Sequence, residues 1–173
     1  MNRLFTRLLC ATAIVGMLLG GLAFTAPDGA EAGLWWPDKN ECAFLSAINK
    51  YRAAHGVRPL TFSRSLGAAA ENHSMYMAKT DDVDHTLGNL SWVDNIFNYG
   101  YPRGQGMGEN VLAGRQSADG ALMLWKTSPG HNQNMLDPNW TTIGVGRAVN
   151  LDGRYGFYWT TIFASRSNRT ISC

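Results

Sequence analysis

Two histidines and one glutamate stand at junctions of the sequence that are rich in turn-forming residues. His85 follows an acidic turn, Glu109 enters a strand-like segment after Gly108, and His131 follows a helix-like segment and Gly130. Two imidazoles and one carboxylate can bind a divalent transition metal and leave coordination positions open for water. The same groups can instead perform acid–base chemistry, because histidine titrates near neutral pH and a carboxylate can orient it.

The spacing of these three residues does not decide between the two chemistries. More than twenty residues separate each from the next, and the sequence contains no HExxH motif. Hydrogen bonding within the protein framework therefore stands as a third interpretation. His73 lies at the margin of an expected apolar helix stripe, and we interpret it as a hydrogen-bonded structural histidine rather than a ligand.

Ser128 lies three residues before His131, with Pro129 and Gly130 between them. This arrangement suits a turn or cap hydrogen bond from the serine side chain. A serine nucleophile would need an oriented base and an oxyanion hole, and the sequence has no GxSxG motif. We therefore expect a local role for Ser128 and no serine catalysis.

The N-terminal segment predicts export from the cytoplasm. Arg3 and Arg7 give it a positive start, a mostly apolar run extends from Leu8 to Phe24, and Ala30-Glu31-Ala32 offers a cleavage site. An uncleaved N-terminal anchor is the alternative. A lipoprotein signal is excluded, because Cys10 lies at the start of the apolar run and not at its end.

These features predict three parts of the chain. We expect a signal peptide over 1–32, an N-terminal arm over 33–39 and a single domain over 40–173, which is an ordinary domain length. No other apolar run approaches the length of a membrane span, so no stable span is expected after signal removal. The expected location is secreted, extracellular or in the cell envelope.

Charge and cysteine content narrow the class of protein further. The formal net charge is only +2, and the charged residues are dispersed along the chain, which predicts neither nucleic acid nor a strongly anionic surface as partner. Once Cys10 is removed, Cys42 and Cys173 remain, and an even pair in an exported protein indicates a disulfide. Such a bond would stabilise the fold by about 4–5 kcal/mol. Two free or intermolecularly paired thiols are the alternative.

The first half of the chain predicts helices. Apolar residues recur at helical spacing over 42–55, where Asp38 or Asn40 can cap the helix and Gly56 can end it. Arg52 and His55 are expected on or near its exposed side. A second helix is expected to begin at Ser63 or Ser65 and a shorter one to lie within 91–100. The apolar stripe of the second helix consists of Leu66, Ala69, Ala70, His73, Met77 and Ala78.

The second half of the chain predicts strands. The segments 107–114, 141–149 and 155–164 are rich in β-forming residues and bounded by turn formers, and Asp152-Gly153 favours a hairpin between the last two. A helix capped by Ser117 separates the first two strands. Helices followed by an antiparallel sheet indicate the α+β class. The tryptophans of the arm, Trp35 and Trp36, are expected to cover an edge of the core.

The ordered motifs resemble the CAP superfamily, the cysteine-rich secretory, antigen 5 and pathogenesis-related-1 group, also called the SCP domain. The matching pieces are "INKYRAAHGVRPLTFSRSLGAAAENHSMYMA", "DH" at 84–85, "GEN" at 108–110, "W..S.GH..NML" at 125–136, "IGVG" at 143–146 and "YWTTIFA" at 158–164. Together they cover about residues 40–164. The chain is similar to short bacterial members. The resemblance implies an α–β–α sandwich with a small central antiparallel sheet and a large cleft.

The resemblance also implies a set of cleft residues. Members with a full site carry two histidines and two acids there, often around a divalent metal such as zinc. His85, Glu109 and His131 match three of those positions, and Ser128 stands where the fourth residue is an acid. A neutral hydroxyl attracts a divalent ion less than a carboxylate does, so we expect His85 and His131 to bind metal more weakly.

Three functions follow from this resemblance. The leading hypothesis is a secreted, non-enzymatic module that binds an unidentified extracellular ligand, such as a lipid or a protein, in its cleft or on its aromatic surface. The second is a metal-assisted hydrolase, a protease or esterase, in which His85 and His131 are the ligands and Glu109 activates water. The third is binding of a lipid or sterol between helices, and the methionine and aromatic residues that favour it equally fit a packed core.

Overall fold

The computed structural model describes residues 35–173. The expected signal peptide over 1–32 lies outside the described residues. The helices are α1 (Lys39–Ala54), α2 (Arg64–Thr80), α3 (Trp92–Asn98), α4 (Ala118–Lys126) and α5 (Pro129–Leu136). The strands are β1 (Thr61–Ser63), β2 (Thr86–Leu87), β3 (Leu90–Ser91), β4 (Met107–Ala113), β5 (Thr142–Asn150), β6 (Gly156–Ala164) and β7 (Thr170–Ile171).

The helices begin where the capping residues predict. Asp38 caps α1, and the Glu41 carboxylate accepts a hydrogen bond from the backbone N–H of Asp38, which completes a capping box. Ser63 caps α2 and Ser117 caps α4 through their side-chain oxygens. Gly56 follows α1 with a φ of 69°, a left-handed conformation that glycine adopts without steric cost.

The main sheet has five strands in the order β4-β6-β5-β1-β7. Its centre is antiparallel, as expected, because β6 pairs with both β4 and β5. However, β1 runs parallel to β5, with Thr61 opposite Thr142 and Phe62 opposite Ile143, so the sheet is mixed and not purely antiparallel. Because β1 and β5 are far apart in the sequence and no turn joins them, no local sequence pattern indicates that they pair in parallel.

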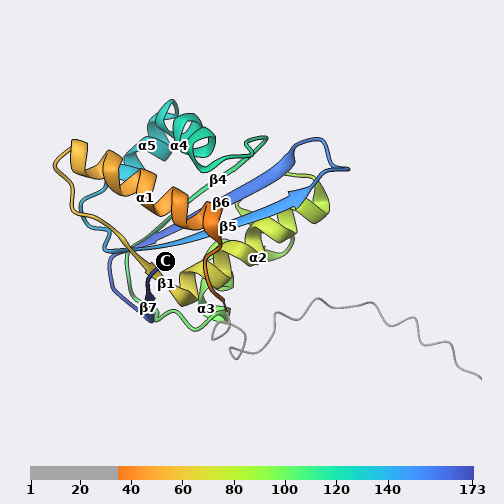
Figure 1. The fold of residues 1–173 in the computed structure, drawn as a ribbon. Coiled ribbons are helices and arrows are strands. Elements are labelled where there is room, and N and C mark those ends of the chain that lie inside the picture. The colour runs from red at the N-terminus through yellow and green to blue at the C-terminus, as the bar shows by residue number, and fades with distance from the viewer. Residues whose placement is uncertain (1–34) are drawn as a thin grey trace, which may run out of the picture.

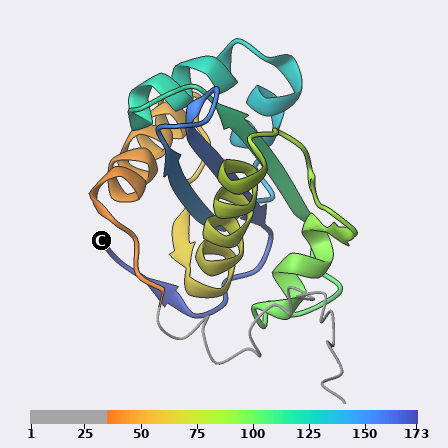
Figure 2. The same ribbon diagram turned by 90° about the vertical axis from the view of Figure 1, so that its right-hand side faces the viewer.

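Helices cover both faces of this sheet, which confirms the α+β class and the three layers (Figure 1). The helices α1, α4 and α5 form one outer layer, and α2 crosses the other face (Figure 2). Phe44, Trp125, Met135 and Trp159 belong to the larger core cluster between the first of these layers and the sheet. The predicted apolar stripe of α2 is entirely buried.

The hairpin between β5 and β6 differs from the tight turn that Asp152-Gly153 predicted. Regular pairing ends at Asn150 and Gly156, and the connection 151–155 is longer than a two-residue turn. Asp81, which caps the end of α2, accepts hydrogen bonds from the Arg154 backbone and from the Tyr158 hydroxyl. This long-range contact with α2 shapes the loop, and dipeptide preferences do not encode it.

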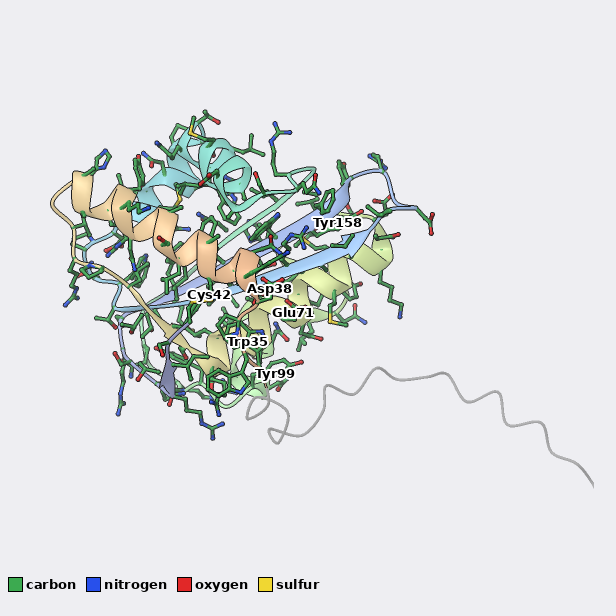
Figure 3. All side chains as sticks on the ribbon, in the orientation of Figure 1. Trp35, Asp38, Cys42, Glu71, Tyr99 and Tyr158 are labelled. Atoms are coloured by element: carbon green, nitrogen blue, oxygen red, sulfur yellow. A yellow bond between two sulfur atoms is a disulfide. The ribbon has the colours of Figure 1, made fainter. Side chains whose placement is uncertain are left out.

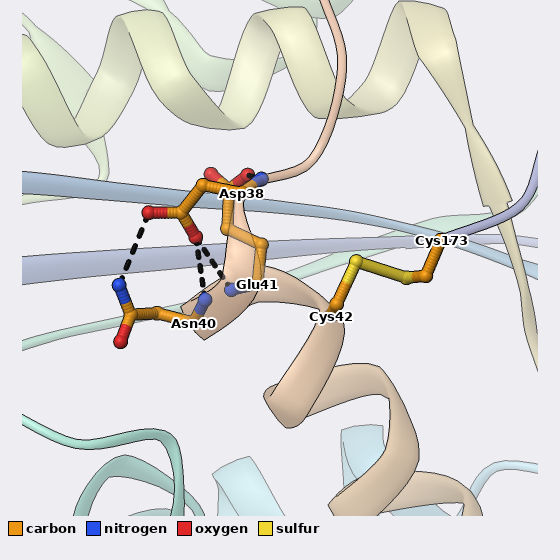
Figure 4. The surroundings of a disulfide bond; sticks show 5 residues. All are labelled: Asp38, Asn40, Glu41, Cys42 and Cys173. Atoms are coloured by element: carbon orange, nitrogen blue, oxygen red, sulfur yellow. Dashed lines mark hydrogen bonds between the residues drawn. A yellow bond between two sulfur atoms is a disulfide. The ribbon is translucent and has the colours of Figure 1, made fainter.

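The arm and the C-terminus close the structure. Trp35 packs edge-on against Phe62, with ring centroids 5.8 Å apart, and covers the core as expected (Figure 3). Trp36 does not, because it is 60% exposed. Cys42 and Cys173 form the predicted disulfide, which ties the C-terminus to α1 (Figure 4). Among the helices of residues 35–173, none is both long and apolar enough to span a membrane.

Candidate functional site

Glu109 is the centre of the polar cluster. It lies on β4, its side chain is only 1% exposed, and each carboxylate oxygen meets an imidazole. Oε2 lies 2.8 Å from Nδ1 of His73, and Oε1 lies 2.8 Å from Nδ1 of His85. A buried carboxylate needs such partners, because an unpaired buried charge is costly. Both oxygens of Glu109 are therefore already engaged.

His73 joins this cluster from α2 and is fully buried. Its Nε2 atom lies 2.9 Å from the backbone oxygen of Asp84, so both ring nitrogens have partners, as the structural interpretation of His73 predicted. A carbonyl oxygen only accepts, so Nε2 must donate to it. Nδ1 contacts Oε2 of Glu109, so the ring is held between that carboxylate and the Asp84 carbonyl.

His85 lies between α2 and β2 and reaches the same carboxylate from outside. Its side chain is 54% exposed, and the hydrogen bond to Glu109 raises its pKa above the usual value of 6.5, against the opposing effect of burial. Because Nδ1 donates to Glu109, the neutral ring presents a free lone pair at Nε2. Within residues 35–173, the Nε2 atom of His85 has no hydrogen-bond partner.

His131 comes from a helix that the sequence did not predict. We expected it after the helix capped by Ser117, but it lies in the first turn of α5 and is half-buried. Burial lowers its pKa below 6.5, and the charge of His85 lowers it further. The two imidazoles therefore interact electrostatically.

Two asparagines hold α5 against β4. Asn110 donates to the backbone oxygen of His131 at 3.0 Å, and Asn134 donates to the backbone oxygen of Glu109 at 3.1 Å. Asn134 also donates to the side chain of Asn110 at 2.9 Å. Sequence reasoning assigned no role to either residue, although both stand within the matching motifs. Their amides set the position of His131 relative to Glu109.

Ser128 occupies the N-cap position of α5 but makes no capping hydrogen bond through its side chain. Of the expected turn or cap hydrogen bond, the cap is therefore wrong, and the helix that begins after Ser128 was not predicted. Pro129 follows it as the first helical residue and lacks a backbone N–H. The half-buried Ser128 side chain lies three residues before His131 on the same element.

Arg52 holds α5, the helix that carries His131, and its position differs from our expectation. We expected it near the exposed side of α1, but it is fully buried. Its guanidinium donates to the backbone oxygens of Arg58, Met135, Asp137 and Trp140. These bonds tie the end of α5 and the following turn to α1. The fork of five donors on arginine suits this role, and a helical periodicity does not reveal it.

This cluster offers few donor atoms to a divalent ion. Nε2 of His85 and the ring of His131 offer two nitrogen ligands, whereas both oxygens of Glu109 are engaged and Ser128 contributes a neutral hydroxyl. Across residues 35–173, no group of three or more His, Cys, Asp or Glu side chains is arranged to hold a metal. Structural zinc sites have four ligands, so an ion here would be exchangeable.

A pocket of about 270 Å³ lies beside this cluster and does not include it. Asp84, which precedes His85, is one of its lining residues. The full lining consists of Tyr76, Met77, Thr80, Asp82, Asp84, Thr86 and Gly88. The lining of this pocket is partly polar. Several large apolar side chains of the protein, including Met77 and Met135, are buried in the core.

Comparison with known proteins places this geometry in context. A model of the cysteine-rich secretory protein family (CAP) matches residues 45–163. The uncharacterized protein YkwD of Bacillus subtilis is 30% identical over 125 residues, which cover 70% of this chain and 46% of that protein. The uncharacterized membrane protein YlbC of the same organism is 25% identical over 62% of this chain and 31% of its own length. The chain thus spans less than half of these relatives.

Solved structures show the same fold at low sequence identity. An outer surface protein from Borrelia burgdorferi has a TM-score of 0.64 and 18% identity, covering 81% of this chain and 96% of that one. An extracellular protein with an SCP domain from Bacillus anthracis has a TM-score of 0.62 and 22% identity, covering 76% of this chain and 45% of that one.

Proposed function

Since the chain belongs to the cysteine-rich secretory protein (CAP) family, we propose that it acts outside the cytoplasm as a non-enzymatic binding domain. The disulfide between Cys42 and Cys173 supports an oxidising location. The basic and apolar N-terminal segment supports export. The solved relatives include an outer surface protein and an extracellular protein, which agrees with the same location.

We further propose that His85 and His131 form an exchangeable site for a divalent metal such as zinc. The observation that carries this proposal is the hydrogen bond between Nδ1 of His85 and the buried Glu109 carboxylate. In metal sites a carboxylate often holds one imidazole nitrogen in this way and directs the other nitrogen to the ion. Glu109 is thus a positioning residue and not a ligand. When bound, the ion would offer open coordination positions to an extracellular partner.

The same geometry argues against a hydrolase that uses Glu109 as base. A general base must reach the proton of its substrate or water within hydrogen-bond distance. Glu109 is 1% exposed, and accepting a proton from solvent would require it to give up His73 or His85. We therefore expect no Glu109-dependent hydrolysis of casein or of an ester panel. Activity that disappears in a folded Glu109→Ala variant would contradict the non-enzymatic proposal.

Zinc binding can be measured by equilibrium dialysis with four chains. The wild type is expected to bind one ion in an exchangeable manner, and both His85→Ala and His131→Ala are expected to abolish binding. His55→Ala is the matched control, because His55 is an exposed histidine on α1 whose Nδ1 contacts the backbone of Tyr51. Lack of zinc binding by the wild type at micromolar zinc, or full zinc binding by His131→Ala, would contradict the proposed metal site.

The pH dependence of zinc binding supplies a second criterion. A histidine must be neutral to bind metal, so zinc competes with the proton on His85. The pKa of His85 is raised above 6.5 by Glu109, whereas the pKa of His131 is lowered by burial. Affinity should therefore rise with pH until His85 has lost its proton. An affinity that stays constant from acid pH to neutral pH would exclude His85 as a ligand.

A further inference from the structure

Four arginines from three separate segments of the sequence lie at one end of the molecule. The backbone N–H of Arg64, at the start of α2, donates to the backbone oxygen of Arg169 at 3.0 Å. The Tyr101 hydroxyl donates to the backbone oxygen of Arg166, and Arg103 follows two residues later. This is the end where α3 and β7 lie in Figure 1.

Further hydrogen bonds join the same segments. Asn168 donates to both the Ser65 hydroxyl and the Gly100 backbone oxygen at 3.4 Å. Gly106 and Ser165 are linked through their backbones at 3.0 Å. The loop 99–106, the segment 165–169 and the start of α2 are therefore fixed against one another, and their arginines form a built surface rather than a chance approach of loose chains.

The charge of this surface is strongly one-sided. Arg103, Arg166 and Arg169 are exposed, and within residues 35–173 none of the three makes an ion pair. The segments 61–70, 97–107 and 163–173 contain no aspartate or glutamate. The acids that border them are Glu71, which directly follows the first segment, and Asp94 and Glu109, which lie on either side of the second. A molecule of small net charge thus carries a concentrated cationic end.

Aromatic side chains stand among these cations. The guanidinium of Arg64 lies 4.5 Å from the ring of Trp36, which is 60% exposed, and the guanidinium of Arg103 lies 4.0 Å from the ring of Phe97. Such stacking orients the guanidinium groups. Tryptophan beside arginine is the combination that suits a membrane interface, where the ring meets the acyl boundary and the guanidinium meets phosphate.

We propose that this arginine surface, formed by Arg64, Arg103, Arg166 and Arg169 with Trp36, docks on a bilayer that contains anionic phospholipids. The position of the N-terminal segment in the sequence, next to this surface, supports a bilayer as the partner. Residues 25–34 join the apolar run Leu8–Phe24 to Trp35, and ten residues span at most about 35 Å. If the run stays uncleaved as an anchor, the alternative to the signal peptide expected over 1–32, it holds Trp35 and the adjoining arginine surface within reach of the headgroups. The concentration of exposed arginines favours an anionic surface in either case.

The test uses the exported chain, with the extent of its N-terminus established by mass spectrometry. Cosedimentation compares vesicles of phosphatidylcholine alone with vesicles that also contain phosphatidylglycerol, at low and at high salt. Any apolar contribution of the N-terminal segment acts on both kinds of vesicle. The difference between them therefore isolates the electrostatic attraction, which salt screens.

Two triple variants with equal net charge locate the effect. R103Q/R166Q/R169Q removes three charges of the arginine surface, and R58Q/R115Q/R154Q removes three exposed arginines elsewhere. Each basic residue near an anionic surface strengthens binding severalfold, so the first variant should lose on the order of a hundredfold in partitioning onto phosphatidylglycerol vesicles. The second should lose little. Circular dichroism confirms that each chain is folded.

Three outcomes would overturn the proposal. The first is equal binding of the wild type to both kinds of vesicle at low salt. The second is an equal loss in the two triple variants, which would assign the attraction to net charge alone. The third is tight binding to soluble polyphosphate without binding to phosphatidylglycerol vesicles, which would make the partner a soluble polyanion. Weaker vesicle binding by Trp36→Ala, with its salt dependence preserved, would support the proposed orientation.

Discussion

At the scale of single residues, the Glu109 carboxylate joins parts of the chain that are distant in sequence. It lies on β4 and contacts His73 of α2 and His85 of the following turn. Sequence motifs identified Glu109 and His85 as site residues, but they gave no reason to connect His73 with them. Contact between His73 and Glu109 depends on how α2 crosses the sheet, which neither residue encodes locally.

Glu109→Gln should lower the pKa of His85. The hydrogen bond to the carboxylate is the main cause of the raised pKa, and burial, which acts in the opposite direction, remains in the variant. The folded state then loses the extra stability that protonated His85 provides, which is fully present below pH 6.5 and disappears as the pH rises through the raised pKa. NMR titration of the histidine ring protons measures the change. An unaltered His85 pKa would show that Glu109 does not control it.

Arg52 illustrates why charged residues in helices are difficult to interpret from the sequence. The apolar spacing of α1 predicted that Arg52 lies on or near its exposed side, but it is fully buried and donates to four backbone oxygens. Three of these oxygens, those of Met135, Asp137 and Trp140, belong to residues that are far from Arg52 in sequence. Helical periodicity indicates which face of a helix is apolar. It does not indicate which distant segments pack against that face and present their backbone oxygens to it.

At the scale of elements, the contact between α2 and β5 rests on two glycines. A methyl group on Gly144 would lie 2.1 Å from the backbone carbon of Leu66, and one on Gly146 would lie 2.2 Å from that of Ala70. Helix α2 therefore packs directly on the backbone of the sheet. This close approach also brings His73 to Glu109, so the glycines contribute to the site without touching it.

Gly144→Ala should destabilise the fold by at least about 1–3 kcal/mol, because the new methyl group meets backbone atoms that cannot rotate away. Gly130→Ala is the matched control. Gly130 lies in α5 with nothing within 4 Å of its added methyl group, so this variant should be neutral or more stable by about 0.5–1 kcal/mol. Urea denaturation measures both. Equal midpoints for the two variants would contradict the close packing of α2.

A second contact between elements joins α1 and α2 through two carboxyl groups. Burial, and then the nearby charges of Glu71 and Asp38, raise the pKa of Glu41 to about 9, and burial also raises the pKa of Glu71. A hydrogen bond links the two side chains, so one of them carries a proton. Asp38 and Glu71 are labelled in Figure 3, and their charges interact across the two helices.

This pair should make the protein more stable at acid pH than at alkaline pH. A raised carboxyl pKa contributes stability that is fully present below the unfolded value of 4.5 and is lost as the pH rises toward about 9. Glu41→Gln keeps an oxygen for the backbone of Asp38 and an amide donor for Glu71, and it should flatten this dependence. Denaturant midpoints across that pH range provide the measurement. An equally steep decline in the variant would assign it to other groups.

At the scale of the whole molecule, the disulfide closes almost the entire described chain. Cys42 and Cys173 are separated by 131 residues, and their bond fixes the last residue beside the first turns of α1. Closing so long a loop reduces the conformational freedom of the unfolded chain more than that of the folded one. The C-terminal segment also carries Arg166 and Arg169, so the bond limits movement of the arginine surface.

Removal of this disulfide should lower the free energy of unfolding by about 4–5 kcal/mol, provided that the folded geometry is unchanged. Cys42→Ser combined with Cys173→Ser tests this by denaturant unfolding, and reduction of the wild type should produce the same loss. If the oxidised wild type and the double variant unfold at the same denaturant concentration, loop closure does not contribute to the stability.

The sequence alone determined the family, the disulfide pair and most elements with their caps, and its N-terminal segment predicts export. Asp38 and Ser63, each one of two predicted candidates, and Ser117 cap their helices, because capping depends on atoms within a few residues. Only the tertiary structure decided the parallel pairing of β1 with β5, the place of His131 in α5 and the burial of Arg52. It also gathered into one surface arginines that the sequence disperses. These features depend on contacts between segments that are distant in sequence, and such contacts form only when the chain folds.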